Sequence, residues 1–253
     1  MRFSTLKFRL QAMLLGMAAM VTAVPAQAGC TPPPPDMDAW YSLNGDGTDR
    51  ILHLDAVASG SVTYDTGHLV GQSLIMNGGG YLAVQSGPVL NQGIGDFSID
   101  AWIRVLPPGL SGLRTLIDKR GGSSSGGVRG WALFTFDGRL GLQLADDGLG
   151  AGYSNYVDSR KLTLGWHHVA VSIDRDDSHG IRFYIDSVAG TALDPTGRRG
   201  DLNNNGPTYF GFNVQSQTRT NGFHMDEVEF FDRVLAPVEV AAIRGADSAG
   251  KCT

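Results

Sequence analysis

Apolar and polar residues alternate most regularly in the run Trp166-His167-His168-Val169-Ala170-Val171-Ser172-Ile173-Asp174. A polar segment of turn-forming residues, 175–180, follows it, and a second alternating run occupies 181–186. Alternation with a period of two on both sides of a short turn is typical of an antiparallel hairpin with one buried face. The residues expected on that face are His167, Val169, Val171 and Ile173. This hairpin predicts that the chain folds as a β-sandwich.

Short runs of the same kind recur along the chain, with Gly, Asn or Asp between them. They occupy residues 40–43, 51–54, 72–76, 81–84, 96–105, 115–119, 131–136, 139–145, 207–214 and 223–231. Asp137-Gly138 is the most specific two-residue hairpin signal. One helix is expected, with Pro237 in its first turn and Gly245 as its stop. The pattern predicts an all-β fold, a two-sheet antiparallel sandwich of jelly-roll type with one short C-terminal helix.

The N-terminal residues 1–28 have the features of a secretory signal peptide. A basic start precedes an apolar run, and Ala26-Gln27-Ala28 forms a small-x-small cleavage site. The apolar run is too short for a transmembrane segment, so we expect a secreted or periplasmic protein. A Pro-rich leader is expected at 29–36 and a single jelly-roll domain at 37–253. Removing residues 1–28 changes the net charge from −5 to −8, which disfavours nucleic-acid binding.

The chain has two cysteines, Cys30 and Cys252, close to the two ends of the mature chain. Outside the cytosol such a pair predicts a disulfide that ties the termini together. In the chain-entropy view, closing so long a loop stabilises the fold by about 5 kcal/mol. The alternative is that Cys30 carries the lipid of a bacterial lipoprotein. Gln27 disfavours that alternative, because such signals normally have a Leu-like residue there.

Several segments together carry a family resemblance. They lie at 30–34, 39–47, 70–74, 95–103, 116–120, 166–171, 182–186, 225–235 and 250–252. In this order and spacing the chain resembles bacterial secreted proteins of the laminin-G-like jelly-roll class, within the concanavalin A-like lectin/glucanase fold. The resemblance implies the fold more strongly than the function, because this scaffold hosts lectins, pentraxin-like proteins, adhesion modules and enzymes.

The segment Asp226-Glu227-Val228-Glu229 is comparable to the alternating carboxylates of glucanases with this fold. Strand alternation predicts Glu227 and Glu229 on one face, about 6.6 Å apart along the strand, with Asp226 facing the core. A carboxylate pair at that separation suits acid–base work. The third carboxylate of the glucanase pattern is missing, so we expect a solvated strand face and no enzymatic activity.

Calcium is the cofactor that the sequence suggests. The resemblance implies a structural Ca²⁺ held by Asp46 or Asp49 together with Asp226, since related domains often hold an ion between the first loop and the last strand. The loop Asp201-Leu202-Asn203-Asn204-Asn205-Gly206 fits the front half of a calcium loop. Phe212 stands where the twelfth-position Glu would be, so a plain Asn-rich turn is favoured there.

A non-catalytic binding module is the function that we expect. The favoured partner is a carbohydrate or a glycosylated surface, bound by loops. Tyr153 and Tyr156 lie in and after a Gly-rich loop and are the candidates for stacking on sugar rings. The alternatives are an adhesion module that contacts a cell-surface or extracellular protein and, third, a glycoside hydrolase. The sequence specifies neither the ligand nor an oligomeric state.

Overall fold

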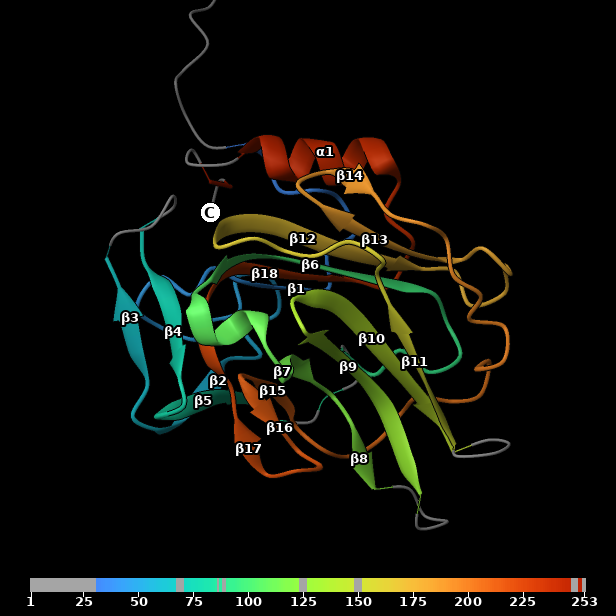
Figure 1. Cartoon of the computed structure of the whole chain (residues 1–253), viewed down its shortest axis with the longest axis horizontal. Coiled ribbons are helices and arrows are strands. Elements are labelled where there is room, and N and C mark those ends of the chain that lie inside the picture. The colour runs from blue at the N-terminus through green and yellow to red at the C-terminus, as the bar shows by residue number, and fades with distance from the viewer. Residues whose placement is uncertain are drawn as a thin grey trace, which may run out of the picture.

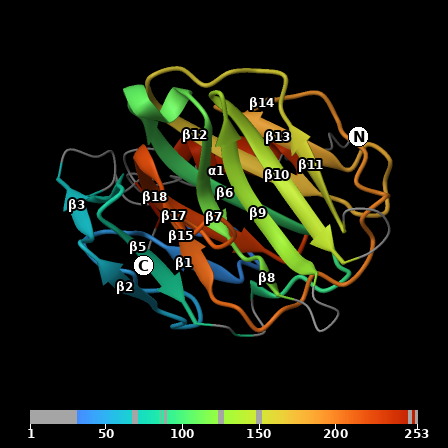
Figure 2. The same ribbon diagram turned by 60° about the horizontal axis from the view of Figure 1, so that its bottom comes forward.

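The fold is a sandwich of two antiparallel sheets, each with eight strands (Figures 1 and 2). The structure is a computed structural model, and it describes residues 31–66, 71–85, 87, 90–122, 127–147, 152–246 and 250–251. In the first sheet the strands run β14-β13-β12-β6-β18-β4-β3, with β1 paired to β18. In the second they run β11-β10-β9-β7-β15-β5-β2, with β8 paired to β9. The two-sheet antiparallel prediction is confirmed.

The elements have the following bounds. The first sheet contains β1 (Ala39–Tyr41), β3 (Thr63–Asp65), β4 (Ser73–Asn77), β6 (Phe97–Val105), β12 (Gly165–Ile173), β13 (Ile181–Ile185), β14 (Val188–Ala189) and β18 (Asn221–Phe231). The second contains β2 (Ala56–Gly60), β5 (Gly80–Val84), β7 (Leu113–Asp118), β8 (Gly121–Gly122), β9 (Val128–Phe136), β10 (Arg139–Asp146), β11 (Tyr153–Val157) and β15 (Thr208–Phe210). A small hairpin, β16 (Phe212–Asn213) and β17 (Thr218–Arg219), a 3₁₀ turn at Pro107–Leu110 and helix α1 (Pro237–Ala246) complete the fold.

The predicted hairpin forms as β12 and β13, with Ile173 opposite Ile181. Val169, Val171 and Ile173 are buried in the core between the sheets. His167, at the outer end of the same face, lies between Thr163 and Asp186 and hydrogen-bonds to both. The Asp137-Gly138 turn joins β9 to β10, and both residues have positive φ, 48° and 75°. A type I′ hairpin turn requires that backbone, which Asp and Gly adopt more easily than other residues.

The core between the sheets is built by alternation along long strands. On β6 the inward residues Phe97, Ile99, Ala101, Ile103 and Val105 are all buried. Trp131 of the second sheet is buried too and packs against Phe97, with ring centroids 5.8 Å apart. Each such aliphatic or aromatic side chain contributes about 1.5–3 kcal/mol when it is removed from water. The hydrophobic effect therefore holds the two layers face to face.

Helix α1 covers part of the outer face of the first sheet (Figure 1). Its Val240 and Ile243 form a second apolar cluster with outward residues of the sheet and the flanking segments. The cluster consists of Met37, Trp40, Ala170, Tyr184, Phe231, Leu235, Val240 and Ile243. At the start of the helix, Glu239 accepts a hydrogen bond from the backbone N–H of Ala236 at 2.8 Å, which satisfies one donor that the helix leaves unpaired.

Three sequence predictions differ from the structure. Residues 51–54 form no strand, because the Asp49 carboxylate accepts their backbone N–H groups and bends the chain around itself. The predicted run 207–214 is divided by Gly211, which has a φ of +80° and turns the chain out of the sheet into β16. The helix continues through Gly245 and ends at Ala246.

The first and last described residues lie together. The backbone N–H of Thr31 donates to the carbonyl of Gly250 at 2.8 Å, and Thr31 and Lys251 form a parallel bridge. Cys30, Cys252 and the predicted signal peptide lie outside the described residues, so the disulfide and the signal stay predictions. In the part of the chain that the structure describes, no helix is both long and apolar enough to cross a membrane.

Candidate functional site

The outer face of the second sheet carries an open groove of about 400 Å³. Strands β7, β9, β10 and β11 form its floor, and Asn213 of β16 borders it. Its apolar lining residues are Leu113, Ala132, Phe134, Phe136 and Val157. Its polar lining residues are Thr115, Arg120, Gln143, Asn155 and Asn213. The groove therefore combines apolar walls with planar polar side chains, as ligand sites commonly do.

Strand alternation places aromatic rings in this groove. On β9, Trp131 and Leu133 point into the core, so Phe134 and Phe136 point outward. Phe134 is mostly buried because its ring lies across β10 at Gly141, where a Cβ would come within 2.3 Å of a ring carbon. Phe136 is 49 % exposed, and its register partner Leu113 on β7 is 50 % exposed. An aromatic surface is thus open to a ligand at one side of the groove.

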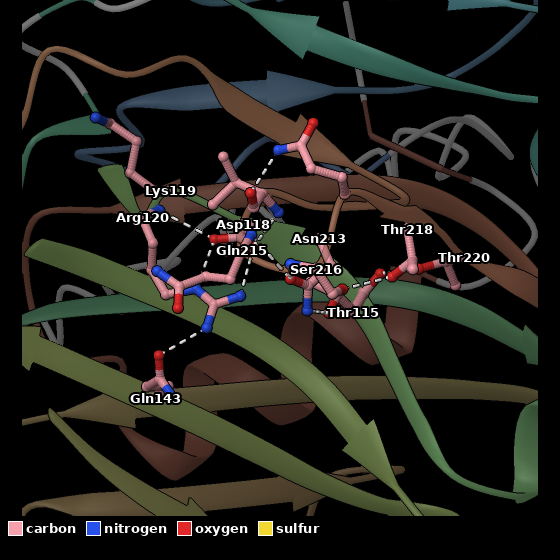
Figure 3. A network of polar contacts seen from close by, with 12 residues as sticks. Thr115, Asp118, Lys119, Arg120, Gln143, Asn213, Gln215, Ser216, Thr218 and Thr220 are labelled. Carbon is pink, nitrogen blue, oxygen red and sulfur yellow. Dashed lines mark hydrogen bonds and ion pairs between the residues drawn. The ribbon is translucent and has the colours of Figure 1, made fainter. Parts of the chain in front are cut away.

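A row of hydrogen-bonded polar side chains crosses the groove floor (Figure 3). The Arg120 guanidinium donates to both oxygens of Asp118, through Nε at 2.8 Å and Nη2 at 2.6 Å. Arg120 Nη1 donates to Gln143 Oε1 at 2.7 Å, and Gln143 Nε2 donates to Asn155 Oδ1 at 2.8 Å. Because the ion pair is bidentate and almost fully buried, the charges of Asp118 and Arg120 compensate each other locally.

The β16–β17 hairpin closes one side of the groove (Figure 3). Asn213 donates through Nδ2 to Thr115 Oγ1 at 2.8 Å, and its Oδ1 accepts the backbone N–H groups of Gln215 and Ser216. The backbone N–H of Val214 donates to Asp118 Oδ2 at 3.0 Å. These bonds attach the hairpin to the polar row, so the groove has a defined wall.

The two predicted stacking tyrosines point to opposite faces of β11. Tyr153 is 42 % exposed and pairs in register with Ala145 of β10. Tyr156 is half-buried and packs against the core between the sheets. The structure therefore does not bring the two rings together as one platform. Their role in ligand binding stays a prediction, and neither lines the groove.

The predicted orientation of the carboxylates on β18 is wrong. Asp226 pairs with Trp102 and Glu229 with Asp100, and the register shifts between those two pairs. Glu227, with φ of 49°, belongs to this β-bulge. The bulge adds one residue, so Asp226 and Glu229 share the outer face of the sheet, and Asp226 does not face the core. The predicted solvated face is also wrong, since all three carboxylates are buried.

The buried carboxylates on the outer face of the first sheet form what we call the acidic cluster: Asp100, Asp226, Glu227 and Glu229. Lys251 Nζ contacts a Glu229 oxygen and lies 3.4 Å from Glu227 Oε2. Trp40 Nε1 donates to the same Glu227 oxygen at 3.0 Å, and His168 Nε2 lies 3.3 Å from Asp100 Oδ1. The side chain of the third-last residue of the chain thus lies against the cluster.

Burial is the largest cause of the pKa shifts of the four carboxyls in the acidic cluster. It raises the pKa of Asp100 to about 7 and that of Asp226 to about 9, with repulsion from Glu227 adding to both. Burial also raises the pKa values of Glu227 and Glu229. Burial alone would lower the pKa of Lys251, but the surrounding carboxylates raise it above its usual value. Asp226 therefore keeps its proton at neutral pH, and Asp100 is only partly ionised there.

Two of the predicted calcium ligands, Asp46 and Asp49, have partners within the chain. Both oxygens of Asp49 are occupied by backbone N–H groups, those of Trp40, Ile51, Leu52 and Leu54. Donors of this kind turn their positive ends toward the carboxylate and do not fit a cation there. Asp46 is bonded to Thr48 and Arg50 at the surface. Among the described residues, no group of three or more His, Cys, Asp or Glu side chains is arranged to hold a metal ion.

The Asn-rich loop at 201–206 already holds a cation of the chain itself. Lys119 Nζ donates to Asn204 O, Asn204 Oδ1 and Gly206 O, at 3.1, 3.0 and 3.0 Å. Burial lowers the pKa of Lys119 to about 8. The ammonium group bonds to loop oxygens that a metal would need, which agrees with the interpretation of this loop as a turn.

The groove residues were missed by the sequence analysis, although a partial signal was present. Gly141 and Gln143 stand at outward positions of β10, directly after the Asp137-Gly138 turn that fixes the register. A glycine inside a long strand often marks a place where another group approaches the backbone closely. Nothing in the sequence indicates that Arg120 and Asn213, from distant segments, meet them.

Comparisons with known proteins agree on the fold. Domain 4 of AbnA, a GH43 extracellular arabinanase from Geobacillus stearothermophilus solved with arabinotriose, is 18 % identical, with a TM-score of 0.61; the match covers 82 % of this chain and 97 % of that one. The binding domain of Paraclostridial Mosquitocidal Protein 1 is 17 % identical, with a TM-score of 0.62 and 81 % of this chain covered. The serotype D botulinum neurotoxin domain solved with N-acetylneuraminic acid is 12 % identical, with a TM-score of 0.62 and 83 % covered.

The chain spans about half the length of the two toxin domains, 51 % and 50 %. At these identities the likeness shows the fold alone. Curated protein sequences include no significant match to this chain. A laminin-G-type family model, described as the concanavalin A-like lectin/glucanases superfamily, matches residues 76–241, which is more than half of the chain. This match shows that the chain belongs to the concanavalin A-like lectin/glucanase superfamily.

Proposed function

We propose that this protein is a non-catalytic carbohydrate-binding module and that the groove on the second sheet holds the sugar chain. The observation that carries the proposal is the pairing of an exposed aromatic ring, Phe136, with a fixed row of planar polar side chains across the groove floor. Sugars have apolar C–H faces that pack on aromatic rings and hydroxyl groups that bond to amides and guanidinium groups. The groove offers a partner for both.

The comparisons support a sugar as the ligand class. The arabinanase domain was solved with arabinotriose and the serotype D toxin domain with N-acetylneuraminic acid. The sequence favours binding of the ligand by loops. We place binding on the sheet face instead, because the groove combines apolar walls with a row of planar polar side chains.

The acidic cluster does not support a hydrolase. Glu227 and Glu229 are buried. Trp40 and Lys251 contact Glu227 Oε2, and Lys251 also contacts Glu229 Oε1. A general acid or base must come within hydrogen-bonding distance of the substrate. Within the described residues these two carboxyls are closed to solvent, so a substrate would have to displace Lys251 or Trp40 to reach them.

Isothermal titration calorimetry against a panel of soluble oligosaccharides tests the proposal. We expect binding by the wild type and at least about a tenfold loss with Phe136→Ala, since an aromatic ring that packs on the ligand contributes about 1–3 kcal/mol when buried. Ile94→Ala is the matched control, because Ile94 is 73 % exposed and does not line the groove.

Tyr153→Ala separates the groove from the predicted tyrosine site on β11. If Tyr153→Ala abolishes binding while Phe136→Ala does not, the ligand binds at the strand edge and the groove proposal is wrong. If no sugar of the panel binds and the protein instead captures an exported protein, the adhesion alternative replaces the proposal.

A further inference from the structure

We propose that the groove selects N-acetylated sugar chains, because its polar row offers hydrogen-bond donors to the ligand while its walls are apolar. This inference rests on the proposed carbohydrate-binding function. The selectivity follows from which side chain donates and which accepts in each hydrogen bond of the row. Arg120 determines these directions, because its guanidinium group can only donate.

The acceptors at two ends of the row are already used. Asp118 Oδ1 accepts the backbone N–H and the Nε–H of Arg120, and Asp118 Oδ2 accepts Arg120 Nη2 and the backbone N–H of Val214. Asn213 Oδ1 accepts two backbone N–H groups. An sp² oxygen has two lone pairs, so these three atoms have none left for a ligand.

The orientation of the two central amides follows from Arg120. A guanidinium group can only donate, so Gln143 must turn its Oε1 toward Arg120. That choice directs Gln143 Nε2 toward Asn155, which must therefore turn its own Oδ1 back toward Gln143. The Asn155 Nδ2 group remains, with both of its N–H bonds available at the exposed edge strand β11.

What the row presents to a ligand is therefore mainly N–H. The second N–H of Gln143, both N–H groups of Asn155 and the second N–H of Asn213 make no bond within the row. A ligand that fills the groove must offer acceptor oxygens to them, since a buried donor without an acceptor costs about 1–3 kcal/mol.

An acetamido group matches both features of the groove. Its carbonyl oxygen accepts from the amides of Gln143 and Asn155, and its methyl group packs against Phe134 and Val157 beside them. A free amino sugar carries an ammonium group, which only donates. The row offers it only the second lone pairs of Gln143 Oε1 and Asn155 Oδ1, and the N–H groups of the row are left without acceptors. The Asp118–Arg120 pair has no net charge to attract either an ammonium group or a carboxylate, and an uncompensated charge is costly to bury.

Three matched hexasaccharides test this selectivity by calorimetry below neutral pH. They are β-1,4-linked N-acetylglucosamine, its fully de-N-acetylated form and β-1,4-linked glucose. We expect the acetylated hexamer to bind at least about tenfold more tightly than the other two, the size of one lost buried hydrogen bond. Phe136→Ala should weaken the acetylated hexamer, which locates its site in the groove.

Gln143→Glu tests the direction of the hydrogen bonds. The carboxylate of this variant can still accept from Arg120 but has no N–H, so Asn155 should turn its Nδ2 inward and present Oδ1 to the groove. The preference for the acetylated hexamer should then disappear, while the far-UV spectrum and melting temperature stay near those of the wild type. Gln85→Glu is the control, because it makes the same change at an exposed position outside the groove.

The outcomes separate this inference from the proposed function. If all three hexamers bind equally, or if the wider panel contains a groove ligand without acyl groups that binds more tightly, the selectivity is wrong and the binding function stands. An unchanged preference in Gln143→Glu also overturns the selectivity. If no sugar of the panel binds, the proposed function fails and the selectivity with it.

Discussion

The outward polar residues are buried on one sheet of the sandwich and line an open groove on the other. On the first sheet, whose outer face α1 partly covers, the outward residues Asp100, Asp226 and Glu229 are buried, and Lys251 contacts Glu229. On the second sheet the outward residues Gln143 and Asn155 stay open in a groove. Both faces arise from the same strand alternation. The segments that pack on an outer face determine whether its polar residues form a buried ionic cluster or a surface that a ligand can contact.

The difference also appears in the chemistry of the two rows. The open row consists mostly of neutral amides, with one compensated ion pair at its end, so it can exchange protein bonds for ligand bonds at little cost. The sealed row holds four carboxyls and one ammonium group, and burial raises the pKa values of Asp100 and Asp226, which favours their neutral forms. The sealed face therefore contributes to stability and responds to pH, whereas the open face is suited to recognition.

The largest expected effect comes from removing the only lysine that contacts the acidic cluster within the described residues. Lys251→Met keeps an unbranched side chain that ends where the ammonium group begins, and it leaves Glu227 and Glu229 without their cation. Removing one partner of a buried ion pair costs about 3–5 kcal/mol. We expect a loss of that size in the free energy of unfolding, measured with urea at neutral pH.

The control for that measurement is Lys161→Met, at an exposed lysine, which should change the free energy of unfolding by less than about 0.5 kcal/mol. An equal loss in the free energy of unfolding in Lys251→Met and Lys161→Met would show that the ion pairs of the acidic cluster do not stabilise the first sheet. Sugar binding by Lys251→Met should be unchanged at temperatures where it is folded, because the groove is on the opposite sheet.

A smaller effect is expected from pH. The unfolded chain releases the Asp100 and Asp226 protons near the ordinary value of 3.8, whereas the folded protein holds them to about 7 and about 9. Since the folded state binds more protons, this contribution is complete below pH 4 and is lost as the pH rises through 7 to 9. We expect the free energy of unfolding to fall by about 1–3 kcal/mol between mildly acidic and mildly alkaline pH.

Asp226→Asn removes one of these titrating groups and keeps its shape, so it should flatten the decline. His168 and Lys251 face the same cluster and are unchanged in that variant. A wild-type stability that rises over this pH range would show that the cluster stays ionised. A slope that Asp226→Asn leaves as steep would show that Asp226 does not contribute to the decline.

The smallest expected effect is that of calcium. Asp49 is satisfied by four backbone N–H groups, so a chelator should leave the melting temperature of the protein unchanged. Differential scanning fluorimetry with calcium and with chelator measures this directly. A clear rise in melting temperature with added calcium would support the structural calcium ion that the family resemblance implies.

Local signals in the sequence predicted much of the sandwich. Alternation placed β6, β12 and β13 and their inward residues, and Asp137-Gly138 placed the hairpin of β9 and β10. Such patterns succeed because a strand with one buried face needs apolar residues at every second position, and a two-residue hairpin needs a backbone that few residues adopt. The short helix and the buried faces follow from the same local rules.

Only the tertiary structure determined which residues form a site. One bulge at Glu227 reversed the face of Asp226, a change that alternation cannot anticipate because it depends on pairing with β6. The groove joins Arg120, Gln143 and Asn213, which are far apart in the chain and meet through sheet order and the β16–β17 hairpin. The sequence determines which face of each strand is apolar. Which polar face is covered and which stays open depends on where the chain ends pack, and that is a property of the whole fold.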